Sequence, residues 1–172
     1  GTDYSIGFDT ALNVIISLIS KIRDTAFSHD RLFVIEVMGR NSGMIAVHAG
    51  LAAAADYILI PEVPIDLVKM ANKIKNHRPG KRHTLIVVAE GDEFGGTELA
   101  KLIKERLPMM ETRLCILGHI QRGGSPTCFD RLIASRMGYS AVECLAEGRH
   151  NVFVGIVNNK MHYIPINEAV KK

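Results

Sequence analysis

The chain has 172 residues, of which 47% are hydrophobic and 23% are charged. This balance is typical of a globular protein with a buried core and excludes a disordered tail or a fibre. Lysine and arginine number 21 against 18 aspartate and glutamate residues, a net charge of only +3, and tryptophan is absent. The composition argues against nucleic-acid binding, which needs basic surfaces and stacking aromatic side chains. It is compatible with anionic small-molecule ligands.

Cysteine usage and hydropathy indicate a cytoplasmic protein. The three cysteines, Cys115, Cys128 and Cys144, are an odd number at spacings too wide for a CxxC motif, so we expect free thiols and no protein-bound metal. The longest uncharged apolar stretch, residues 43–55, is too short to span a bilayer, and no signal peptide is present. We therefore expect no membrane partner. Because the chain opens on a helical pattern with no strand before it, we expect it to belong to a longer polypeptide.

Hydrophobic periodicity predicts helices that alternate with buried strands. Apolar residues recur at helical spacing over residues 6–27, and the run LFVIEVM at 32–38 is typical of a parallel strand buried on both faces. The alternation predicts further helices at 44–55, 66–76, 97–107 and 129–147, and further strands at 57–60, 84–89, 112–117, 152–157 and 161–164. The pattern indicates an α/β fold of three layers, α/β/α, with a mostly parallel sheet whose ligands bind beyond the carboxyl ends of the strands.

Two of the loops after predicted strands carry candidate ligand-binding residues. The loop at residues 39–43 opens a helix, so its backbone N–H groups could hold an anion beside Arg40, although glycines after a strand are as often plain turn residues. Glu90 ends the strand at 84–89, where its carboxylate could accept hydrogen bonds from a sugar hydroxyl or could simply be solvated.

The most informative loop is GHIQRGGSP at residues 118–126. It places His119 and Arg122 beyond the strand that contains Arg113, and three such donors suit a phosphate monoester. The basic turn at residues 75–83 is a second candidate anion site, although a run of charges is more often a solvated surface.

Taken together, the segments IGFDTAL, KIRDTA, VIEVMGR, ILIPE, VVAEG, ETR and LGHIQRGGSPTCFDR resemble the bacterial ATP-dependent 6-phosphofructokinases. The resemblance extends from residue 1 to about residue 157, and GHIQRGGSP is highly specific to that family. The family transfers the γ-phosphoryl group of MgATP to the 1-hydroxyl of fructose 6-phosphate in glycolysis. The resemblance implies a phosphofructokinase-like fold in which residues 1–119 form the sugar-phosphate and effector lobe and residues 120–172 return to the nucleotide-binding lobe.

The resemblance also assigns roles to individual residues. Arg40 is expected to be catalytic, beside the phosphoryl group in flight. Arg31 and Arg113 are expected to reach into a neighbouring subunit's site, which implies an oligomer, in this family usually a homotetramer. The full set of residues expected to bind substrate is Arg31, Met38, Gly39, Arg40, Glu90, Arg113, His119, Ile120, Gln121 and Arg122.

An effector site for ADP or phosphoenolpyruvate is implied as well. The sequence departs from the family pattern there, with Asp56 where glutamate is usual, Ala54 where glycine is common and Pro79 where lysine is common. We therefore expect weak or absent activation by ADP. The residues at effector positions are Arg23, Ala54, Ala55, Asp56, Lys81, Arg82 and His83.

Part of the family's catalytic apparatus does not occur in this sequence. The glycine-rich ATP-binding segments and the TIDND segment, whose aspartate acts as the base, are missing, so we expect no turnover by these 172 residues alone. Two alternatives remain open. One is a pyrophosphate-dependent phosphofructokinase, although the opening GTDYSIGFDTA is more like the ATP-dependent group. The other is a non-catalytic module that binds sugar phosphate or nucleotide.

Overall fold

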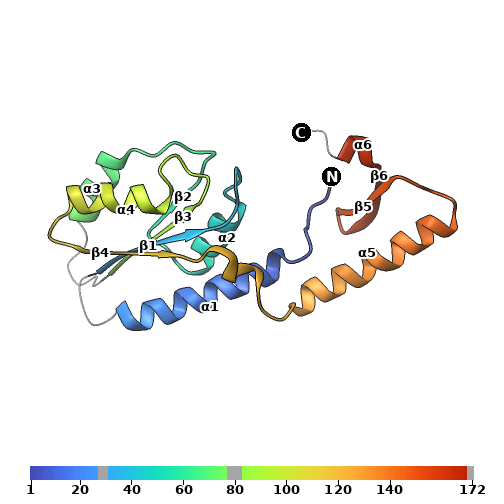
Figure 1. Cartoon of the computed structure of the whole chain (residues 1–172), viewed down its shortest axis with the longest axis horizontal. Helices are drawn as coiled ribbons and strands as arrows, with labels where there is room; N and C mark the ends of the chain where they lie inside the picture. The colour runs from blue at the N-terminus through green and yellow to red at the C-terminus, as the bar shows by residue number, and fades with distance from the viewer. Residues whose placement is uncertain (27–30, 77–82, 170–172) are drawn as a thin grey trace. The chain divides into compact units, whose positions relative to one another are not determined.

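The computed structural model of the chain describes residues 1–26, 31–76 and 83–169 (Figure 1). The chain forms two compact units. We call Ala11–Gly123 the sheet unit, and Gly1–Thr10 together with Gly124–Lys172 the hairpin unit.

Four parallel strands form the centre of the sheet unit, in the order β2-β3-β1-β4. The central strand β1 pairs on both sides, with Arg31 opposite His83 of β3 and Glu111 of β4. Because all the strands run in the same direction, their carboxyl ends meet at one edge of the sheet. The strands are β1 (Arg31–Val37), β2 (Tyr57–Leu59), β3 (His83–Ala89) and β4 (Glu111–Ile116).

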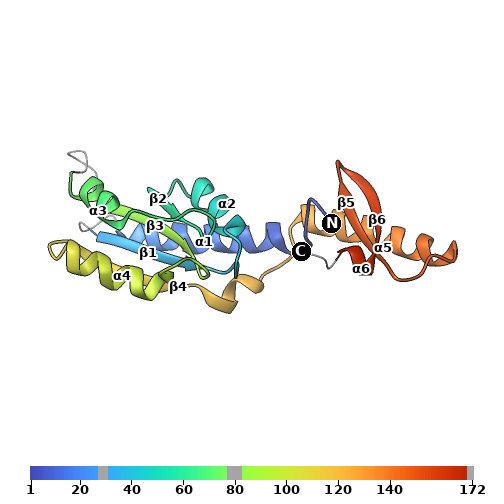
Figure 2. The same cartoon turned by 90° about the horizontal axis from the view of Figure 1, so that it is seen from above.

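Helices cover both faces of this sheet, which confirms the predicted three-layer arrangement (Figures 1 and 2). Ile35 and Val37 of β1 pack with the first two helices, whereas Leu32 and Val34 pack with the next two. Successive side chains of a strand point to opposite faces, so a strand covered on both is apolar along most of its length. The helices are α1 (Phe8–Ala26), α2 (Met44–Ala52), α3 (Leu67–Lys75) and α4 (Gly95–Arg106).

The hairpin unit contains an antiparallel pair of strands that is separate from the parallel sheet. Asn158 and Asn159 join them with φ of 51° and 60°, the left-handed conformation that a two-residue hairpin turn requires. The backbone N–H of Asp3 donates to the carbonyl of Ile156 at 2.7 Å, which ties the first residues of the chain to this hairpin. Among the described residues, no helix has the length and apolar character needed to cross a membrane. The elements are α5 (Cys128–Ala146), β5 (Val152–Val157), β6 (Lys160–Pro165) and α6 (Ile166–Ala169).

Candidate functional site

The carboxyl edge of the parallel sheet collects most of the predicted substrate-binding residues. The strands β1, β3 and β4 are in register, with Val37 opposite Ala89 and Glu36 opposite Ile116, so the loops that follow them meet at this edge. We call it the carboxyl edge. Its loops carry Met38, Gly39, Arg40, Glu90, His119, Ile120, Gln121 and Arg122.

The turn after β1 holds Arg40 in a strained conformation. Its φ is 50°, in the left-handed region that costs a non-glycine residue roughly 1–3 kcal/mol. Glu90 stabilises the turn, because its Oε1 accepts hydrogen bonds from the backbone N–H groups of Arg40 (2.9 Å) and Gly39 (3.3 Å). Gly91 lets the two loops approach this closely, since a Cβ at that position would lie 1.6 Å from the carbonyl oxygen of Arg40. The loop after β3 therefore fixes the turn after β1.

Four backbone N–H groups of this turn donate hydrogen bonds within the protein itself. The N–H groups of Gly39 and Arg40 donate to the carboxylate of Glu90, as described above. Ser42 donates to the carbonyl of Gly39 at 3.0 Å, and Gly43 donates to both carboxylate oxygens of Glu62 at 2.8 and 3.1 Å. An anion held by the backbone N–H groups of Gly39, Arg40, Ser42 or Gly43 would have to displace these acceptors. An anion at this edge would instead meet the side chain of Arg40, which is exposed.

The segment beyond β4, predicted as an irregular loop, contains the 3-10 helix η1 (Gly118–Arg122). A 3-10 helix repeats every three residues, so His119 and Arg122, both exposed, lie on the same face. Gln121 is only 2% exposed. Its Oε1 accepts from the backbone N–H of Met38 at 3.1 Å, and its Nε2 donates to the carbonyl of Gly118 at 2.9 Å. The motif therefore exposes the side chains of His119 and Arg122 and buries the side-chain amide of Gln121 between them.

Two predicted substrate residues, Arg31 and Arg113, lie at the opposite, amino edge of the sheet. Both bind Glu111: Arg31 Nε donates to Oε2 at 2.7 Å, and Arg113 Nη2 donates to Oε1. The hydrogen bond from Arg31, reinforced by Arg113, lowers the pKa of Glu111 below its usual value. Sequence reasoning missed Glu111, although its place two residues before Arg113, at the start of a strand beside β1, was a usable signal.

Several predicted effector residues also lie at the amino edge. Arg23 Nη1 donates to the carbonyl of Ala53 at 2.7 Å, next to the predicted segment. Ala54 has φ of 49°, which explains physically why glycine suits this position. Asp56 Oδ2 accepts from the backbone N–H of Leu85 at 2.9 Å, so this carboxylate helps to hold β3.

The rest of the predicted effector set is only partly described. Ala55 lies just before β2, and His83 is the first residue of β3; both are partly buried. Lys81 and Arg82 lie outside the described residues, as does Pro79.

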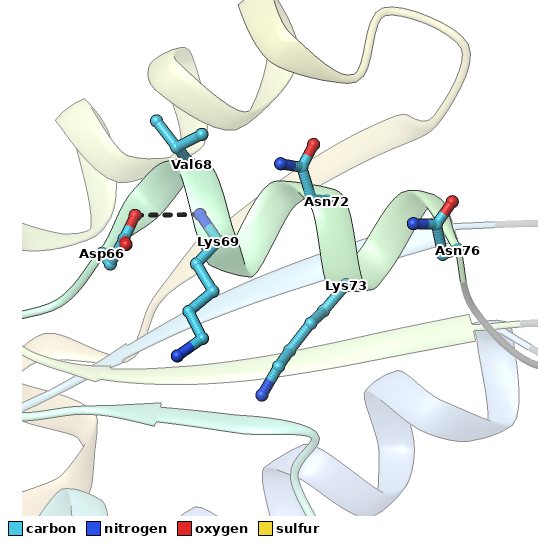
Figure 3. Close-up of a pocket in the computed structure, with 6 residues that line it drawn as sticks. All are labelled: Asp66, Val68, Lys69, Asn72, Lys73 and Asn76. Carbon is cyan, nitrogen blue, oxygen red and sulfur yellow. Dashed lines mark hydrogen bonds between the residues drawn. The ribbon is translucent and has the colours of Figure 1, made fainter.

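A shallow hollow along α3 contains none of the predicted site residues (Figure 3). Asp66 caps the helix there, since its Oδ1 accepts from the backbone N–H of Lys69 at 2.9 Å. We assign this face a structural role in starting α3. The lining residues are Asp66, Val68, Lys69, Asn72, Lys73 and Asn76.

Two curated relatives of this chain carry the same name. This chain is 52% identical to the ATP-dependent 6-phosphofructokinase of Halalkalibacterium halodurans, and the alignment covers 100% of this chain and 54% of that protein. It is 55% identical to the enzyme of the same name from Bacillus subtilis strain 168, covering 94% of this chain and 50% of that protein. The chain thus spans about half the length of the curated relatives it matches.

Solved structures give the same fold. Phosphofructokinase from Saccharomyces cerevisiae superposes with a TM-score of 0.90 at 38% identity, over 98% of this chain and 24% of that one. The pyrophosphate-dependent phosphofructokinase of Marinobacter aquaeolei shares the fold at a TM-score of 0.72 and 23% identity, over 93% of this chain and 44% of that one. The family model described as phosphofructokinase matches residues 1–145. This chain belongs to the phosphofructokinase family.

Proposed function

We propose that this chain is the carboxyl-terminal half of an ATP-dependent 6-phosphofructokinase. The complete enzyme transfers the γ-phosphoryl group of ATP to the 1-hydroxyl of fructose 6-phosphate, a step of glycolysis in the cytoplasm. Identity above 50% to relatives named for ATP, against 23% to the pyrophosphate-dependent enzyme, supports ATP as the donor. The observation that carries the proposal is the carboxyl edge, where the turn of Arg40 and the helix with His119 and Arg122 follow neighbouring strands.

The carboxyl edge suits an anionic sugar. Arg122 and His119 bind the 6-phosphate from one face of η1, where guanidinium is a preferred ligand of phosphate. Glu90 commits Oε1 to the backbone, which leaves Oε2 to accept a hydrogen bond from a sugar hydroxyl. Arg40 neutralises negative charge on the phosphoryl group as it moves. Met38, Gly39 and Ile120 complete the predicted substrate-binding surface.

Arg31 and Arg113 serve a second subunit. Strand β1 separates Arg31 from the carboxyl edge by seven residues, or roughly 20 Å of extended chain, and Arg113 binds the same Glu111 as Arg31. A complete sugar-phosphate site therefore takes them from a neighbour. This arrangement requires an oligomer, and we propose the homotetramer usual for the family.

Mg²⁺ enters the complete enzyme as its complex with ATP, and there it neutralises phosphate charge. The described residues include no group of three or more histidine, cysteine, aspartate or glutamate side chains that could hold a metal.

The amino edge is proposed as the effector site. Arg23 and the cationic residues in the sequence 75–83 supply the positive charge that a small anion such as phosphoenolpyruvate needs. ADP is expected to activate weakly, since Pro79 supplies no charge and Asp56 is shorter than glutamate and already binds backbone. The proposed effector residues are Arg23, Ala54, Ala55, Asp56, Lys81, Arg82 and His83.

The test is a coupled assay of the complete polypeptide with fructose 6-phosphate and either ATP or pyrophosphate. Arg122→Ala removes a charge-assisted contact made equally in ground and transition states, so KM for the sugar should rise about tenfold to a hundredfold with little change in kcat. Arg40→Ala should lower kcat. Arg106→Ala, an exposed arginine on α4, is the control.

Three results would contradict the proposal. Turnover with pyrophosphate but not with ATP would mean that pyrophosphate is the phosphoryl donor. Binding of fructose 6-phosphate with no turnover from either donor would support a non-catalytic module. If Arg122→Ala lowered kcat and left KM for the sugar unchanged, Arg122 would not be a ligand of the 6-phosphate. The isolated 172-residue chain should be inactive.

A further inference from the structure

Gln121 differs from its neighbours in η1 because its side chain is inside the protein. It is 2% exposed, whereas His119 and Arg122, on either side of it, are exposed. A ligand at the carboxyl edge can reach those two residues but not the buried amide. Direct contact with substrate is therefore a poor explanation for this residue.

Both ends of the Gln121 amide bind backbone groups, and the two groups belong to different loops. Oε1 accepts from the N–H of Met38, the first residue after β1, at 3.1 Å. Nε2 donates to the carbonyl of Gly118, the first residue of η1, at 2.9 Å. One side chain thus connects the loop that carries Arg40 with the helix that carries the proposed phosphate ligands.

The same turn is bound from its other side by the loop after β3. Glu90 accepts from the N–H groups of Gly39 and Arg40, so three consecutive backbone donors, starting at Met38, are held by side chains of two other loops. Met38 and Gly39 are partly buried and Arg40 is exposed, and these three bonds hold a residue with a strained φ of 50°. The position of Arg40 therefore depends on both neighbouring loops.

The chemistry of this bridge requires a primary amide of this length. Methionine has a similar shape but offers no N–H and only a weak acceptor, and glutamate keeps the acceptor while losing the donor. Asparagine is one methylene shorter and cannot reach both groups from the same backbone.

We propose that Gln121 is a positioning residue that fixes the turn of Arg40 relative to η1, and that it is not a ligand of the substrate. The proposal rests on the proposed function, because it concerns the distance between the group that acts on the phosphoryl group and the groups that bind the 6-phosphate. Misplacing a reacting group by about 1 Å can cost about a hundredfold in rate.

Steady-state kinetics of the complete enzyme test the role. Gln121→Met should lower kcat about tenfold to a hundredfold and change KM for fructose 6-phosphate by less than about threefold, since the phosphate ligands stay on η1. Gln121→Glu, which keeps the bond from Met38, should fall between wild type and Gln121→Met. Asp66→Ala removes a side chain-to-backbone hydrogen bond at α3 and should leave kcat and KM unchanged.

A second measurement does not depend on activity. Hydrogen exchange of the Met38 amide in the complete enzyme should become at least about tenfold faster in Gln121→Met, and stay unchanged in Asp66→Ala. A raised KM at unchanged kcat would make Gln121 a substrate ligand and overturn the proposal, as would unchanged kinetics with unchanged exchange. If the wild-type enzyme shows no phosphofructokinase activity, the proposed function fails, and the exchange data still decide whether the amide holds this turn.

Discussion

Substitution of Asp130 by asparagine should loosen the start of α1. Asp130 lies in the first turn of α5 and is 3% exposed. Its carboxylate accepts hydrogen bonds from the backbone N–H groups of Gly7 (3.0 Å) and Thr10 (2.8 Å), and from the Thr10 hydroxyl. Because α1 begins at Phe8, this carboxylate caps the helix from a segment 120 residues away. Asparagine keeps the volume but offers one acceptor oxygen and no charge.

The expected loss follows from these bonds. A hydrogen bond to a charged group contributes about 1.5–3 kcal/mol, and loss of a helix cap costs about 0.5–2 kcal/mol. Asparagine retains part of this interaction, so we expect a local loss of about 2 kcal/mol. Since about 1.4 kcal/mol corresponds to tenfold, amides in the first turn of α1 should exchange about 30 times faster.

The pH dependence has a definite sign. Burial alone would raise the pKa of Asp130, but the hydrogen bonds from Thr10 and Gly7 outweigh it and hold the pKa below its usual value. The stabilisation is therefore complete above the unfolded pKa of about 3.9 and is lost as the pH falls through the lower folded pKa. The difference in first-turn exchange rate between wild type and Asp130→Asn should therefore shrink as the pH falls through the folded pKa of Asp130.

Hydrogen exchange followed by mass spectrometry, with both proteins at equal pH, measures this difference. Glu147→Gln, an exposed carboxylate at the other end of α5, is the control and should not alter exchange at α1. Equal first-turn exchange in wild type and Asp130→Asn at pH 7 would refute the capping argument.

Two further substitutions test the two edges of the sheet in the complete enzyme. Gly91→Ala should lower kcat at least about tenfold, because the added Cβ would displace the carbonyl of Arg40. Gly138→Ala is the control and should leave kcat unchanged, since a Cβ there meets no atom within 4 Å. Equal kcat in the two variants would contradict the packing argument. Glu111→Gln should lower KM for fructose 6-phosphate by a factor of about two to five, because it releases Arg31 and Arg113 from their ion pairs. Glu98→Gln, which removes an ion pair on α4, is the control and should leave KM unchanged. A raised KM in Glu111→Gln would mean that Glu111 orients the two arginines for binding.

The layers of the fold could be predicted from the sequence because their signals are local. A strand buried on both faces is a nearly continuous apolar run, and β3, with six of its seven residues buried and only Thr84 polar among them, shows this directly. The exposed cationic residues Arg40 and Arg122 were found in the same way, because glycine-rich loops after strands are visible in the chain itself. The turn between β5 and β6 was less evident, although the pair Asn158 and Asn159 is a recognisable hairpin signal.

The contacts that position the site could not be predicted, because they join residues far apart in sequence. Gln121 lies 83 residues from Met38, and Glu90 lies 50 residues from Arg40. A glutamine within a ligand-binding motif is equally compatible with contact to substrate and with burial, and only the path of the chain decides between them. The sequence thus determined which residue types reach the carboxyl edge, whereas the tertiary structure decided which of them face solvent and which hold the others in place.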